Sequence, residues 1–90
     1  MSQSAYQFRG FRIRSDMLDA IKRYTEDHEP RGDFLRAVIS NDLRNAVGYA
    51  DDDNLTNLPA FVAYFYNIAP GPCWGSPEKY LAWIGKNADA

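Results

Sequence analysis

A chain of 90 residues, 46% of them apolar, is long enough for one folded domain and too short for two. Its net charge of −2 gives no electrostatic signal for duplex nucleic acid, so specific DNA binding is not expected. The single cysteine, Cys73, excludes an internal disulfide, and the polar first residues predict no signal peptide. The longest apolar run, residues 60–69, is too short to span a bilayer, so we expect a cytoplasmic protein without membrane contact.

The first residues are predicted to precede the helical part of the chain. Apolar side chains alternate weakly over residues 6–14, which fits either one short extended strand or a bent pair of strands. A single strand would need a partner strand, which a second subunit could supply. We therefore divide the chain into an N-terminal extension, residues 1–14, and a helical domain, residues 15–90. The side chains that carry the alternation are Tyr6, Phe8, Phe11 and Ile13.

The first half of the helical domain is predicted to hold two helices. Ser15 is a favourable N-cap, and apolar spacing predicts a helix from there to about His28, because Pro30 disfavours a helical residue before it. A second helix is predicted from Phe34 to about Gly48, with Asp33 as its cap. The apolar stripe of this second helix consists of Leu35, Val38, Ile39, Leu43 and Ala46.

The third helix is predicted to run to about Ala69, and its start stays open. Proline is tolerated only in a first turn or at a kink, so either Thr56 or Asn57 caps the helix just before Pro59, or the helix starts near Asp52 and bends at Pro59. The run of Pro70, Gly71 and Pro72 then ends it.

The last helix has the clearest start. Ser76 is a favourable N-cap, Pro77 occupies the first helical position, and Gly85 is expected to stop the helix. The whole pattern predicts an all-α fold: a small four-helix domain, with or without one short strand at the N-terminus.

Polar residues interrupt the apolar stripe of the second helix. Asp42 falls inside the apolar arc, with Asn41 and Asn45 beside it, and a buried carboxylate must be paired or hydrogen-bonded. A structural interpretation is that Asp42 caps a neighbouring helix or accepts hydrogen bonds from the turn at residues 73–76. A functional interpretation is that the three polar side chains face a ligand in a partly dry pocket.

Two predicted helix starts could bind anionic groups. The segments 31–36 and 76–79 each open a helix, whose free N–H groups can donate hydrogen bonds to phosphates or carboxylates. Trp74 or Tyr64 could stack on a base, or Trp74 could simply fill the core behind a tight turn. The candidate ligand-binding residues are Arg31, Arg36, Asn41, Asp42, Asn45, Tyr64, Tyr66, Trp74, Ser76 and Lys79.

The chain offers few groups for catalysis. His28 and Cys73 lie in separate predicted loops, and the sequence contains no Ser-His-Asp order, metal-ligand cluster or glycine-rich phosphate loop. We therefore expect a binding protein that is not an enzyme, with no catalytic residue, no cofactor and no metal.

Two strings of residues resemble a family of small accessory proteins of phages, prophages and plasmids. The resemblance covers about residues 17–83, and the family carries no established activity. The resemblance implies that the gene belongs among short genes that act on a bacterial host, including counter-defence genes. The strings that carry it are Gly32-Asp33-Phe34-Leu35-Arg36-Ala37-Val38 with Asn41-Asp42-Leu43 and Ala50-Asp51, and Tyr64 to Asn67 with Pro70 and Cys73-Trp74-Gly75-Ser76-Pro77-Glu78.

Three functions remain open from the sequence. The first is anti-defence by sequestering a small nucleotide signal, in a homo-oligomer in which Arg36 and Lys79 neutralise phosphate. The second is a protein that inhibits a host defence complex, of anti-CRISPR or anti-restriction type, whose acidic run at residues 51–53 imitates nucleic acid. The third is a small structural or regulatory subunit without a ligand.

Overall fold

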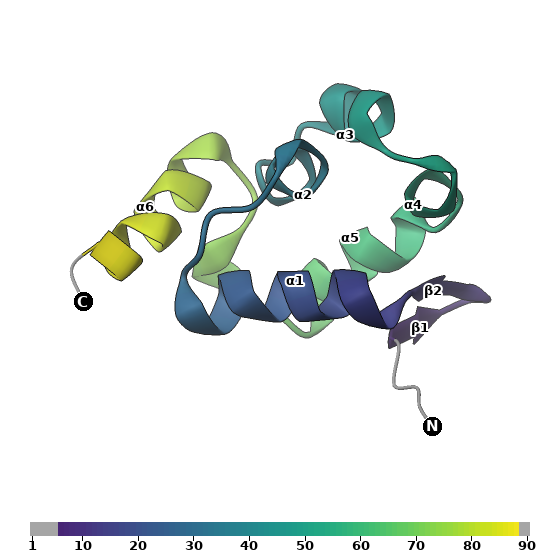
Figure 1. Ribbon diagram of the computed structural model, residues 1–90, viewed down its shortest axis with the longest axis horizontal. Helices are drawn as coiled ribbons and strands as arrows, with labels where there is room; N and C mark the ends of the chain where they lie inside the picture. The colour runs from purple at the N-terminus through teal and green to yellow at the C-terminus, as the bar shows by residue number, and fades with distance from the viewer. Residues whose placement is uncertain (1–5, 89–90) are drawn as a thin grey trace.

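The computed structural model describes residues 6–88, with side chains to residue 86, and in this range the chain forms one hairpin, six α-helices and a short 3-10 turn (Figure 1). The predicted mostly helical class with an N-terminal strand is confirmed. Expectations for residues 1–5 and 89–90 lie outside the described range. The elements are β1 (Tyr6–Phe8), β2 (Phe11–Ile13), α1 (Ser15–Asp27), α2 (Asp33–Ile39), α3 (Leu43–Tyr49), α4 (Asp52–Thr56), α5 (Leu58–Asn67), η1 (Gly71–Cys73) and α6 (Pro77–Ala88).

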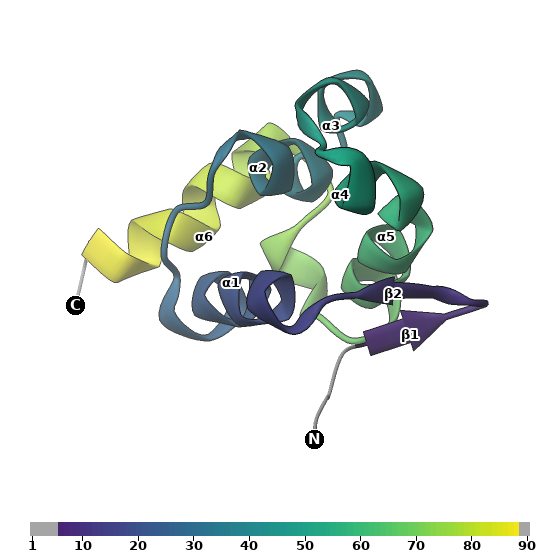
Figure 2. The same cartoon turned by 45° about the vertical axis from the view of Figure 1, so that its right-hand side comes forward.

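The N-terminal segment forms a bent pair of strands. β1 and β2 pair in antiparallel register, with Phe8 opposite Phe11. Arg9 and Gly10 between them have φ angles of 51° and 84°, and two positive φ angles are what a tight two-residue hairpin turn requires. β1 thus has its partner within the same chain, and the hairpin lies against α5 (Figure 2). No helix in the described range is long and apolar enough to cross a membrane.

Two of the four predicted helices are each divided in the structure. The predicted span 34–48 forms α2 and α3, and the span from Asp52 onward forms α4 and α5. Asn57 ends α4 and begins α5, and Pro59 then lies in the first turn of α5, where its missing N–H is tolerated. Both alternatives for the third helix therefore contain part of the answer: the helical path starts at Asp52, and a new helix starts just before Pro59.

The predicted helix ends differ from the structure in small ways. Ser15 and Asp33 are the first residues of α1 and α2, and not their caps, because Arg14 and Gly32 have the extended backbone of the cap position. The expectation that Gly85 stops the last helix is wrong, since α6 continues to Ala88. Glycine costs a helix only about 1 kcal/mol relative to alanine, so α6 passes through this position.

A buried chain of hydrogen bonds joins α1 to η1 and α6. The Tyr24 hydroxyl donates to the carbonyl oxygen of Cys73 at 2.5 Å, and the Trp83 indole N–H donates to the carbonyl oxygen of Tyr24 at 2.9 Å. The Tyr24 ring stacks on Tyr80 with ring centres 5.7 Å apart. Burial raises the pKa of the Tyr24 hydroxyl, and it raises the pKa of the Cys73 thiol to about 11. Both groups are therefore neutral parts of the core at physiological pH.

A second backbone contact ties α2 to the turn before α6. The N–H of Gly75 donates to the carbonyl oxygen of Ile39, the last residue of α2, at 2.8 Å. Gly75 has a φ angle of 118°, which L side chains rarely adopt, so the turn requires glycine here. With this contact, α6 is fixed against both α1 and α2 at the end of the molecule opposite the hairpin (Figure 1).

Removal of the buried hydroxyl in Tyr24→Phe should lower the free energy of unfolding by about 1–3 kcal/mol, because the Cys73 carbonyl stays buried and loses this donor. Urea unfolding followed by circular dichroism measures the loss. Tyr49→Phe is the matched control, because Tyr49 is 57% exposed and the stability of this variant should match that of the parent. Equal stability of the two variants would contradict the role given to the Tyr24 hydroxyl.

Candidate functional site

The break between α2 and α3 is built from two polar residues. Asn41 has a φ angle of 61°, the left-handed conformation that asparagine tolerates and a helix interior does not allow. The N–H groups of Asn41 and Asp42 donate back to the carbonyl oxygens of Val38 and Ala37, at 3.1 and 2.8 Å. These two hydrogen bonds form a Schellman motif that closes the C-terminus of α2.

Asp42 then starts the next helix. Its carboxylate accepts a hydrogen bond from the backbone N–H of Asn45 at 3.3 Å and another from the Asn45 side-chain amide at 2.7 Å. Asp42 is half-buried and is the N-cap of α3, so it does not lie inside a continuous apolar arc. The structural interpretation is correct for the cap. The alternative, in which Asp42 accepts hydrogen bonds from the turn at 73–76, is not the one adopted, and the Gly75 N–H of that turn donates to the Ile39 carbonyl.

The break turns apolar side chains of α3 toward solvent. In a continuous helix, Leu43 would lie four residues beyond the buried Ile39 on the same face. Instead Leu43 is 67% exposed, and Val47 and Tyr49 are 44% and 57% exposed, while Ala46 alone in α3 is buried. Figure 1 shows α3 at the outer edge of the molecule, beyond α2.

A polar cleft of about 290 Å³ lies beside α3. It is bounded by α2, α3 and the start of α6. The guanidinium carbon of Arg36 lies 5.4 Å from the centre of the Tyr80 ring, which steadies this cation at the cleft. Arg36 shares the cleft lining with the carboxylates of Asp33 and Asp42, so the cleft can bind groups of mixed charge better than polyanions. The lining residues are Asp33, Arg36, Ala37, Ser40, Asp42, Asn45, Tyr49 and Pro77.

The cleft brings together three of the ten predicted ligand-binding residues: Arg36, Asp42 and Asn45. Asn41 and Trp74 line a neighbouring hollow of only about 40 Å³. Ser76 and Lys79 belong to the first turn of α6, where the Ser76 hydroxyl accepts the Lys79 N–H at 3.1 Å. Ser76 is therefore the N-cap that the sequence predicted, and its hydroxyl already satisfies one of the N–H groups that the phosphate hypothesis requires.

The other predicted residues lie away from the cleft. Tyr64 is buried, with its ring edge-on to Tyr6 at 5.2 Å, so it cannot stack on a base. Trp74 is half-buried against Phe65, as the core-filling alternative predicted. Arg31 forms an ion pair with Glu29 at 3.2 Å. Tyr66 is exposed on α5, in a separate apolar groove.

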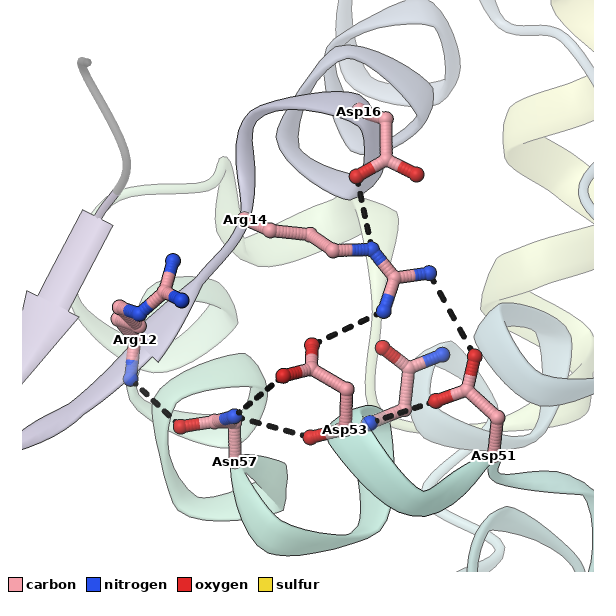
Figure 3. Close-up of polar contacts among 7 residues, drawn as sticks. Arg12, Arg14, Asp16, Asp51, Asp53 and Asn57 are labelled. Atoms are coloured by element: carbon pink, nitrogen blue, oxygen red, sulfur yellow. Dashed lines mark hydrogen bonds and ion pairs between the residues drawn. The ribbon is translucent and has the colours of Figure 1, made fainter. Parts of the chain in front are cut away.

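The acidic run at residues 51–53 takes part in the fold. Arg14 pairs with Asp16 at 2.8 Å, with Asp53 at 2.9 Å and with Asp51 at 3.5 Å (Figure 3). Asp51 also caps α4 by accepting the backbone N–H of Asn54 at 2.7 Å, which, with Arg14, lowers the pKa of Asp51. These contacts hold α4 to the junction of β2 and α1. Part of the negative charge of this run is thereby neutralised by Arg14.

Sequence reasoning missed the apolar part of this site. Leu43 and Val47 were assigned to a helix that runs through residue 48, and Tyr49 lay beyond its end. The signal that could have found them is the pair Asn41-Asp42, a residue tolerant of the left-handed conformation followed by a strong N-cap.

Comparisons with known proteins give no family assignment. No family model, curated protein or solved structure matches the chain. Within residues 6–88, no group of three or more His, Cys, Asp or Glu side chains is arranged to hold a metal ion. The site must therefore be interpreted from its own geometry.

Replacement of the cap in Asp42→Ala should lower the free energy of unfolding by about 1 kcal/mol, because α3 loses its N-cap. Asp42→Asn keeps a side-chain oxygen at the same place and should stay close to the parent. Thermal and urea unfolding compare the three proteins. If Asp42→Ala is as stable as Asp42→Asn, the cap does not hold α3.

Proposed function

We propose that this protein is a binding module that docks a protein partner on α3 and the polar cleft beside it. The observation that carries the proposal is the exposure of Leu43, Val47 and Tyr49 on a seven-residue helix. These three residues, together with Arg36 and Asn45 of the cleft, are called the α3 surface below. Leu43 and Val47, four residues apart, share one face of this short helix, and Tyr49 lies on the side that borders the cleft. Three exposed large apolar side chains on so short a helix are more than the scattered exposure that is normal for a protein surface.

The composition of the α3 surface supports recognition of a protein. Full removal of an exposed Leu or Val side chain from water contributes about 1.5–3 kcal/mol to the free energy of binding. This gives the exposed Leu43 and Val47 the role of apolar anchors. Tyrosine and arginine are enriched among the residues that dominate binding energy at interfaces, and Tyr49 and Arg36 both line the cleft beside α3. Apolar and polar groups in one patch are typical of contacts between separately folded proteins.

Binding without catalysis is part of the proposal. The Cys73 thiol is buried and its pKa is raised to about 11, so it is a weak nucleophile at neutral pH. The His28 ring contacts Trp83, with its Nδ1 3.1 Å from the Trp83 carbonyl oxygen. The two groups best suited to nucleophilic chemistry are thus engaged in the fold.

The resemblance to phage and plasmid accessory proteins supports a host protein as the partner. On this basis we propose a role against a bacterial host process, with a defence protein in the host cytoplasm as the expected target. The mixed chemistry of the α3 surface fits such a target better than the acidic run does, because Arg14 and the α4 cap engage Asp51 and Asp53.

Leu43→Asp should abolish stoichiometric capture of a partner from bacterial lysate, and Tyr49→Ala should weaken the purified complex at least about tenfold, as expected for an anchor at an interface. The matched control is Leu81→Asp, because Leu81 is 55% exposed but lies on α6. Binding is measured by calorimetry with the captured partner. Equal losses for Leu43→Asp and Leu81→Asp would exclude the α3 surface.

A small nucleotide is the second candidate ligand for the cleft. Its support is that Arg36, Asn45 and Tyr49 lie together, so one cleft offers a cation, an amide and an exposed aromatic ring. In this candidate, Tyr49 takes the stacking role that was predicted for Trp74 or Tyr64. The carboxylates of Asp33 and Asp42 oppose phosphate binding, which is why the protein partner is the first candidate.

Thermal unfolding against a panel of nucleotides, including cyclic di- and trinucleotides, tests the second candidate. A ligand at about 100 times its Kd adds about 2.7 kcal/mol of stability, which should raise the Tm of a domain of this size by about 10 °C or more. A nucleotide bound in the cleft should lose this shift in Tyr49→Ala. A panel without any shift would exclude a nucleotide ligand.

A further inference from the structure

An apolar groove of about 570 Å³ lies on the side of the molecule where the hairpin meets α5. It is lined by Phe8 of β1 and by one face of α5 from Leu58 to Asn67. Val62 and Tyr66, four residues apart on that face, are 43% and 77% exposed. Leu58 and Val62 also border the small hollow that Leu43 lines, so the groove adjoins the α3 surface, but its other lining residues belong to the hairpin and α5 alone.

The groove differs from the α3 surface in charge. None of the ten residues of α5 is charged, and the polar groups that line the groove are the Asn67 side chain and the Tyr66 hydroxyl. Interfaces between permanent partners, and homodimer interfaces above all, are more apolar than contacts between proteins that also exist apart. An uncharged helical face can also meet its own copy without repulsion between like charges.

We propose that a second copy of this chain covers the groove, with α5 packed antiparallel against α5 of the copy around a two-fold axis near Val62 and Ala63. The lining residues of α5 fall at 58–59, 62–63 and 66–67, a spacing that is symmetric about 62–63. Antiparallel pairing about this centre sets Val62 opposite the copy's Ala63, next to the axis, and Tyr66 opposite the copy's Pro59. A patch that pairs with itself in this way is what a two-fold interface requires.

The side chains along α5 suit close packing of two helices. Ala63 at the centre is small, which permits the interaxial distance of about 8–10 Å found between packed helices. α5 is about 15 Å long, so Tyr66 at one end reaches the groove floor beside the copy's Leu58 and Phe8. Burial of Tyr66, the most exposed of the large apolar side chains, would remove the largest solvent contact of this face.

Sedimentation velocity over about 1–100 μM tests the second copy directly, a range that covers micromolar dissociation constants. The parent should sediment as a dimer, and Val62→Asp should weaken dimerisation at least about 100-fold, because two carboxylates would meet near the axis. Leu81→Asp, with its charge on α6, should remain a dimer. If Val62→Asp does not fold, Tyr66→Ser provides the same test at a more exposed position.

A cross-link gives an independent readout of the axis. Val62→Cys should form an intermolecular disulfide under mild oxidation, because a residue near a two-fold axis meets itself, whereas Leu81→Cys should not. The native Cys73 is buried and does not compete. A parent that is monomeric throughout the range, a dimer that persists in Val62→Asp, or equal cross-linking of the two cysteine variants would each overturn the proposal. Sedimentation and cross-linking are measured on the protein without a partner, so their outcome is independent of whether Leu43→Asp abolishes partner capture, and the two proposals fail separately.

Discussion

The exposed surface of this protein depends on a helix break at Asn41 and Asp42. Asn41 in the left-handed conformation closes α2, and Asp42 accepts the N–H of Asn45 and opens α3. A single helix through this point would bury Leu43 on the face of Ile39 and would leave α3 without an apolar outer face. Two adjacent polar residues thus decide whether Leu43 and Val47 belong to the core or face solvent.

The other polar contacts fix the elements that lie on either side of this break in the chain. Tyr24, Cys73 and Trp83 fix α6 to α1, and the Gly75 N–H fixes the preceding turn to the end of α2. At the opposite end, Arg14 joins the hairpin and α1 to α4. With both ends fixed, the chain presents two apolar faces of different character. The face on α3 is mixed with charge and suits a separate partner, whereas the face on α5 is uncharged and suits a second copy.

The sequence predicts the class of the fold and the places where helices begin better than it predicts their continuity. Ser76 and Pro77 identify the start of α6 because caps act locally. The stripe from Leu35 to Ala46 keeps helical periodicity across the break, so periodicity alone could not reveal that α2 ends at Ile39. The polar candidates Arg36, Asp42 and Asn45 do lie together. Tyr64 is buried and Trp74 is half-buried, because burial is set by tertiary contacts with Tyr6 and Phe65.

Backbone NMR of the protein in solution tests the central claim, that the chain breaks between α2 and α3. The account predicts helical Cα chemical shifts over residues 33–39 and again over 43–49, separated by non-helical values at 40–42, with Asn41 showing the coupling constant of a positive φ angle. It also predicts that the N–H of Asp42 is protected from exchange by the Ala37 carbonyl. An uninterrupted run of helical shifts from Asp33 to Tyr49 would contradict the break, and with it the outward placement of Leu43.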